Sequence, residues 1–123
     1  MGGKKKILII DDEEVFGRLL KLNVEESQEY EAVLAVNGAQ GVAMAQQEKP
    51  DLILLDIRMP DMDGLTVLRK IKVLTPEVPV AMVTAVWSER EAKEAFAAGA
   101  YEYITKPVNF EYLRTALLVK LYG

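Results

Sequence analysis

Three aspartates of this sequence directly follow short apolar runs. Asp11 and Asp12 come after Ile7-Leu8-Ile9-Ile10, and Asp56 comes after Ile53-Leu54-Leu55. A carboxylate can bind a hard cation, attack phosphorus as a nucleophile or serve as a general acid or base. Cysteine and histidine are both absent, which excludes a disulfide framework, a thiol nucleophile, a Cys/His zinc site and a histidine base. Chemistry in this chain therefore rests on carboxylate, hydroxyl and amine groups.

A hydroxyl and an amine stand at similar positions later in the chain. Thr84 follows the apolar run at 80–83, and Lys106 follows the run at 101–105. Each residue alone has a simpler explanation: Asp12 as a helix N-cap, Thr84 as the end of a strand and Lys106 as a surface amine. Their shared position after apolar runs favours a common site.

The apolar pattern alternates between two periods along the chain. Short runs rich in β-branched residues predict strands at 7–10, 30–36, 51–55, 80–83 and 101–105. Amphipathic patterns predict helices at 15–24, 39–47, 65–71, 92–96 and 110–121. This repeated order of strand and helix, without an intervening linker, indicates one open α/β domain whose parallel sheet carries helices on both faces.

Capping signals agree with these boundaries. Asn37 suits the start of the second helix and Asn109 the start of the fifth, because both side chains can accept from free backbone N–H groups. Ser88 and Glu91 have the spacing of a capping box at the start of the fourth helix. Gly99 suits the left-handed residue that ends that helix.

Composition limits the partners and the location of the chain. With 19 acidic and 15 basic residues the net charge is −4, and no basic block is longer than Lys4-Lys5-Lys6. We therefore expect no direct binding to nucleic acid. The longest mainly apolar segment, at 78–87, is too short to span a bilayer, and the N-terminus lacks the layout of a signal peptide. These features predict a cytoplasmic protein that does not enter membranes.

The predicted fold brings the polar residues together, because ligands of open α/β sheets bind outside the carboxyl ends of the strands. Three neighbouring carboxylates repel one another and need a cation. With oxygen ligands alone, Mg²⁺ is the natural candidate. A divalent ion, the Lys106 amine and the Thr84 hydroxyl around one carboxylate form a receptor for a phosphoryl group. Asp56 would then be the nucleophile that forms an aspartyl phosphate.

These motifs together resemble the receiver domain of the two-component response regulators. The resemblance spans residues 5–122. It rests on four segments in the family's order, namely Ile10-Asp11-Asp12-Glu13, the stretch at 55–64 that contains Asp56, Pro60 and Gly64, Val83-Thr84-Ala85, and the stretch at 99–107 that ends in Lys106-Pro107. Four segments at four predicted strand ends make a chance match improbable.

The resemblance implies a flavodoxin-like fold with strand order 2-1-3-4-5. It also implies that Asp56 accepts the phosphoryl group and that Thr84 and Lys106 contact it. Mg²⁺ would be bound by Asp11, Asp12 and Asp56 together with the backbone carbonyl of Arg58. The Lys106-Pro107 peptide would be cis.

Tyr103 falls on the family's switch aromatic, which turns inward as Thr84 moves toward the phosphoryl group. Plain packing on the last strand explains Tyr103 equally well. The phosphoryl donor implied by the family is a sensor histidine kinase or a phosphotransfer protein. The output would be binding of a downstream protein, or homodimerisation, through the fourth helix, fifth strand and fifth helix. We expect a leader at 1–5, a receiver domain at 6–122 and no output domain.

Three side chains near the predicted site have open roles. Arg58 and Val86 lie two residues beyond Asp56 and Thr84, where they flank the path of attacking water. An apolar Val86 offers that water no hydrogen bond, and Arg58 would either occupy the path or pair with the phosphoryl oxygens. We therefore expect slow self-dephosphorylation. Trp87 is either an exposed anchor for a partner or partly packed against the strand before it.

Two other functions use the same residues. A Mg²⁺-dependent phosphohydrolase of the haloacid dehalogenase type also has an aspartyl nucleophile, but the acid it needs two residues later is replaced here by Arg58. A pseudo-receiver that serves only for dimerisation would have lost Asp56, Thr84 or Lys106, and the chain keeps all three. We therefore predict a signalling switch rather than a conventional enzyme.

Overall fold

The computed structural model describes residues 3–123, and these form a parallel five-stranded sheet with the order β2-β1-β3-β4-β5. This order confirms the predicted 2-1-3-4-5 topology. All five predicted strands are present, with small changes at their ends, as β1 (Lys5–Ile10), β2 (Tyr30–Ala35), β3 (Leu52–Leu55), β4 (Val80–Thr84) and β5 (Glu102–Thr105).

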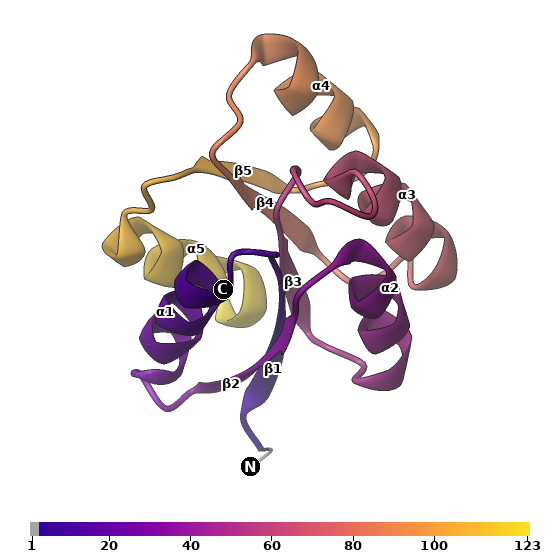
Figure 1. Ribbon diagram of the computed structural model, residues 1–123. Helices are drawn as coiled ribbons and strands as arrows, with labels where there is room; N and C mark the ends of the chain where they lie inside the picture. Colours follow the sequence, from indigo (N-terminus) through magenta and orange to yellow (C-terminus); the bar gives the residue numbers. More distant parts are fainter. Residues whose placement is uncertain (1–2) are drawn as a thin grey trace.

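Each strand is followed by a helix, as the apolar pattern predicts. The helices are α1 (Glu14–Glu25), α2 (Gly38–Gln47), α3 (Gly64–Leu74), α4 (Glu89–Ala97) and α5 (Phe110–Tyr122). Figure 1 shows α1 and α5 on one side of the sheet and α2 and α3 on the other. None of the helices within 3–123 is both long enough and apolar enough to cross a bilayer.

Two hydrophobic layers hold the helices on the sheet. Side chains such as Leu8 and Ile53 point toward α2, α3 and α4, whereas Ile7 and Leu52 point toward α1 and α5. Every residue of β3 is buried. A strand covered on both faces must be apolar at successive positions, which explains why the chain reads as an uninterrupted apolar run before Asp56.

Most of the predicted caps are confirmed. The side chains of Asn37 and Asn109 accept hydrogen bonds from the backbone at the starts of α2 and α5. Gly99 has φ = 111°, in the region that favours glycine, just after α4. At the start of α4 the Ser88 hydroxyl accepts from the Glu91 N–H, but the Glu91 carboxylate lies near Arg58 instead of completing a capping box.

The strand register determines how far along the strand direction the residues after each strand lie. Ile10 is paired with Ala35 of β2 and with Leu55 of β3. The backbone ladder continues one residue further, because the Asp11 N–H donates to Ala35 O and the Asp56 N–H donates to Ile10 O, both at 3.0 Å. Asp11 and Asp56 therefore leave the sheet at the same level.

The last strand places Lys106 at this same edge. Its N–H donates to the Thr84 carbonyl oxygen at 2.8 Å, and the Lys106-Pro107 peptide is cis, as the resemblance implies. The predicted leader at 1–5 lies partly outside the described residues, and its Lys5 already pairs with Tyr30 in the sheet.

Candidate functional site

An acidic cluster occupies the carboxyl edge of the sheet. Asp11, Asp12 and Asp56 each offer a carboxylate oxygen, and these oxygens all lie within 4.8 Å of one another. Asp11 and Asp56 are buried, with 4% and 5% exposure, while Asp12 is more accessible. Oxygen-only donors at this spacing, with one open side, fit a hard divalent cation better than a soft metal. The cluster can therefore bind a metal ion.

Lys106 supplies the cluster with a positive charge. Its Nζ lies 2.9 Å from Asp11 Oδ2 and 3.5 Å from Asp56 Oδ2. A third carboxylate, from Glu13, lies 2.6 Å from the same amine. The amine also sits 4.2 Å from the centre of the Phe16 ring, in the geometry of a cation–π contact. Sequence reasoning missed Glu13 and Phe16, because neither residue follows a strand directly.

Burial and neighbouring charges have opposing effects on the pKa values of Asp11 and Lys106. Burial raises the pKa of Asp11, and the nearby Asp56 carboxylate adds to this effect. For Lys106, burial is the largest influence and lowers the pKa, but the hydrogen bonds to Glu13 and Asp11 outweigh it, so the net pKa is raised. Lys106 therefore remains a cation at neutral pH, and an ionised Asp11 gains from any further positive charge nearby.

The Asp56 carboxylate has a fixed orientation. Its Oδ1 accepts a hydrogen bond of 2.7 Å from the Ile57 N–H, which leaves Oδ2 facing Lys106. Close packing holds the backbone here, because the Gly64 N–H donates to the Ile57 carbonyl and a Cβ on Gly64 would collide with the carbonyl oxygen of Asp56. The close approach of two backbone segments thus explains why position 64, in the stretch at 55–64, is a glycine.

A chain of contacts leads from the cluster to the surface. The fully buried Thr84 accepts from the Val86 N–H at 3.1 Å. The Tyr103 hydroxyl donates to the Val86 carbonyl oxygen at 2.6 Å. The Trp87 ring packs edge-on against the Tyr103 ring, with 5.8 Å between the centroids. Thr84 and Tyr103 are therefore both tied to the loop between β4 and α4.

Comparison of the chain with protein-family profiles identifies its family. The profile described as response regulator receiver domain matches residues 7–118. The chain belongs to this family. As a receiver domain it is a signalling module rather than a conventional enzyme, and receiver domains pair with histidine kinases.

Two curated relatives illustrate the range of this family. The receiver domain is 39% identical over 108 residues to the DNA-binding dual master transcriptional regulator RpaA of Synechocystis sp., covering 86% of this chain and 44% of that protein. It is 36% identical over 115 residues to the transcriptional regulatory protein ZraR of Salmonella typhimurium, covering 94% of this chain and 26% of that protein. The chain thus spans less than half the length of either relative.

Solved structures support the same assignment. A CheY-like receiver domain protein from Methanospirillum hungatei superposes with a TM-score of 0.91 at 35% identity, covering 97% of this chain and 94% of that chain. A two-component response regulator from Clostridium difficile gives a TM-score of 0.90 at 31% identity, with 94% of both chains covered. The receiver domain therefore has the CheY-like flavodoxin fold that its sequence predicts.

Two other acids of the receiver domain serve as helix caps. Asp63 accepts from the Leu65 N–H and begins α3. Asp61 accepts from the N–H groups of Gly38 and Ala39 at the start of α2, and these bonds lower the pKa of its carboxyl. The sequence pattern does not predict this role of Asp61, because the helix that it caps lies 22 residues earlier in the chain.

Trp87 of the receiver domain is mainly exposed. Its exposed fraction is 67%, and that of Phe96 on α4 is 48%. Both rings pack against Tyr103, at centroid distances of 5.8 and 6.5 Å. Trp87 is therefore both partly packed, against Tyr103, and largely accessible, as an anchor for a partner must be.

Proposed function

We propose that this receiver domain accepts a phosphoryl group on Asp56 in the presence of Mg²⁺ and thereby changes its affinity for a partner. The observation that carries the proposal is the position of Asp56. Its buried carboxylate is oriented by the Ile57 N–H, and its Oδ2 faces Lys106 inside the acidic cluster. A fixed nucleophile beside a fixed cation is what phosphoryl transfer requires.

The transfer step can be written with these residues. An Asp56 carboxylate oxygen forms a bond to phosphorus, while the bond from phosphorus to the donor breaks and leaves its electron pair on the donor. Lys106 neutralises charge on the equatorial oxygens, and the Thr84 hydroxyl turns from the Val86 N–H to bond one of them. Asp11, Asp12, Asp56 and the Arg58 carbonyl would hold Mg²⁺, which supplies further neutralisation of the transferred group.

The donor on this account is a phosphohistidine of a sensor kinase or phosphotransfer protein in the cytoplasm. An apolar stripe on α1 supports docking of such a donor. Val15, Leu19 and Leu22 lie on one face of the helix, and their exposed fractions are 84%, 46% and 68%. Helix α1 begins two residues after Asp12. A protein that covers this stripe would therefore have its histidine close to the acidic cluster.

The output is a change at α4, β5 and α5. The contacts from Thr84 through Val86 to Tyr103 provide a path along which movement of Thr84 toward a phosphoryl group alters the loop before α4. The exposed rings of Trp87 and Phe96 lie over this path and offer anchors for a downstream protein or a second copy of the chain.

The competing functions fit these residues less well. A phosphohydrolase needs an acid two residues after its nucleophile, and Arg58 points instead toward Glu91. A dimerisation module without phosphorylation would not need Asp56, Thr84 and Lys106 at one edge of the sheet. The partly buried, apolar Val86 beside the site supports slow loss of the phosphoryl group, and rapid loss with Mg²⁺ and no partner would contradict that expectation.

Borohydride reduction tests the proposed attachment site. The protein is treated with a small acyl phosphate and Mg²⁺, reduced and digested, and the peptides are weighed. An aspartyl phosphate is reduced to homoserine, whereas a free carboxylate is not. We expect homoserine at position 56 alone. Homoserine at position 11 or 12, or at no position, would overturn the assignment.

A further inference from the structure

Arg58 borders two hollows at the carboxyl edge of the sheet. The inner hollow, of about 280 Å³, is lined by the acceptor Asp56 together with Thr84 and Lys106. The outer hollow, of about 610 Å³, lies between the loop after β3 and the start of α4, and Glu91 lines its far side. Arg58 therefore lines both the phosphoacceptor pocket and the cleft beside it.

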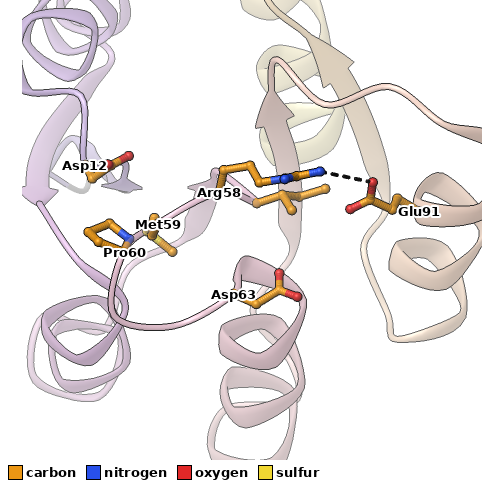
Figure 2. Close-up of a pocket in the computed structure, with 7 residues that line it drawn as sticks. Asp12, Arg58, Met59, Pro60, Asp63 and Glu91 are labelled. Atoms are coloured by element: carbon orange, nitrogen blue, oxygen red, sulfur yellow. Dashed lines mark ion pairs between the residues drawn. The ribbon is translucent and has the colours of Figure 1, made fainter.

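In this structure the guanidinium points outward, across the cleft. Figure 2 shows Arg58 extending from the loop after β3 to the Glu91 carboxylate on α4. Arg58 Nη2 lies 3.8 Å from Glu91 Oε1, and the exposed fractions of the two side chains are 74% and 26%. An ion pair this long and this exposed is weak, so a stronger anion nearby can take the guanidinium from Glu91.

A phosphoryl group on Asp56 would be such an anion. It carries close to two negative charges and three acceptor oxygens, which a guanidinium can bind in a bidentate manner. The other cation at the pocket, Lys106, is already shared among Asp11, Glu13 and Asp56. The phosphoryl group would therefore share Lys106 with these carboxylates, and Arg58 is the second basic residue that lines the same hollow.

We propose that Arg58 exchanges its partner on phosphorylation, leaving Glu91 and binding the phosphoryl oxygens on Asp56. This inference rests on the proposed function of Asp56. The exchange stabilises the phosphorylated state and at the same moment removes a tether between the loop after β3 and the first turn of α4. Glu91 and the phosphoryl group thus compete for one guanidinium, which links α4 to the occupancy of the pocket.

Competition predicts opposite effects of the two partners. The probe is beryllofluoride with Mg²⁺, a mimic of the phosphoryl group, and its affinity is measured by calorimetry. Arg58→Ala should weaken binding by about twofold to fivefold, and Arg58→Lys should restore part of the loss. Glu91→Gln frees the guanidinium and should strengthen binding by about twofold. In the Arg58→Ala background, Glu91→Gln should have no effect.

A second ion pair of the chain is a matched control. Arg69 on α3 and Glu94 on α4 lie 3.8 Å apart, with exposed fractions of 55% and 38%, but Arg69 does not line the phosphoacceptor pocket. Arg69→Ala should therefore leave the affinity unchanged.

Two results would overturn the inference. One is a Glu91→Gln variant that binds the probe no better than wild type, and the other is an equal effect of Glu91→Gln with and without Arg58. Failure of the proposed function would look different, because wild type would then bind no probe and gain no phosphoryl mass from an acyl phosphate.

Discussion

The Tyr103 hydroxyl donates a hydrogen bond of 2.6 Å to the backbone carbonyl oxygen of Val86. This bond joins β5 to the loop between β4 and α4, and the Val86 N–H is held in turn by the Thr84 hydroxyl. A change at Thr84 therefore has a direct route to Tyr103 and to the Trp87 ring that packs on it. Trp87 is the single tryptophan of the sequence, so its fluorescence reports on this route.

Occupation of the pocket should change the Trp87 fluorescence. We expect beryllofluoride with Mg²⁺ to alter the emission of wild type, because the Thr84 hydroxyl turns from Val86 toward the bound group. Thr84→Ala should remove most of the change. Thr115→Ala, which alters a hydroxyl on the exposed face of α5, should keep it. An unchanged response in Thr84→Ala would show that another route connects the pocket with Trp87.

Polar substitution on α1 should slow transfer from a protein donor. Val15→Gln removes apolar surface from the proposed docking stripe, and burying one valine contributes enough to change the rate on the order of tenfold. The donor is any phosphohistidine protein that labels wild type. Val73→Gln is the control, since Val73 lies on α3 and is 79% exposed compared with 84% for Val15. Labelling by a small acyl phosphate should be equal in all three proteins. Equal transfer from the protein donor would exclude α1 as its docking surface.

Removing one charge from the acidic cluster should stabilise the protein in the absence of metal. Asp56→Asn relieves repulsion with Asp11, whereas its contact with Lys106 is the longest of that amine's three ion pairs. Without Mg²⁺ the melting temperature should rise by a few degrees, about 4 °C for roughly 1 kcal/mol. Mg²⁺ should stabilise wild type more than the variant. Asp63→Asn is the control, because asparagine keeps the helix cap, and it should melt like wild type. A melting temperature of Asp56→Asn below that of wild type would contradict the electrostatic explanation.

The buried Tyr30 should make the fold sensitive to alkali. Burial raises the pKa of Tyr30 from 10.0 to about 12. A pKa raised by folding means that the folded state favours the neutral form of the Tyr30 side chain. The contribution of this neutral side chain to the free energy of unfolding is complete below pH 10 and is lost as the pH approaches 12. The Tyr30 hydroxyl has no hydrogen-bond partner within the described residues. Tyr30→Phe should therefore be at least as stable at pH 8 and should lose less between pH 10 and 12, as measured by thermal melts. A parallel loss in both proteins would refute this.

The fold was predictable from sequence because its main determinants are local in the chain. Buried strands such as β3 need apolar residues at every position, and caps such as Asn37 and Asn109 act within three residues. The convergence of Asp11 and Asp56 follows from parallel strands of matched register. For these residues, a rule about strand ends is enough to place the side chain at the site.

Contacts between distant segments were not predictable in this way. Asp61 caps a helix that precedes it, and Glu13 reaches Lys106 across 93 positions. The Glu91 carboxylate lies near Arg58 instead of completing a capping box. Each of these depends on which rotamer of a long or exposed side chain finds a partner after folding. Periodicity and spacing carry no information about that choice.

The intact mass of the protein after treatment with an acyl phosphate and Mg²⁺ tests the central claim most directly. Wild type, Asp56→Asn and Asp63→Asn are compared, because Asp63 is an acid of the same loop that caps α3. We expect one added phosphoryl group on wild type and on Asp63→Asn, none on Asp56→Asn, and none on any protein when Mg²⁺ is chelated. Wild type without added mass, or equal labelling of Asp56→Asn, would contradict phosphorylation at Asp56.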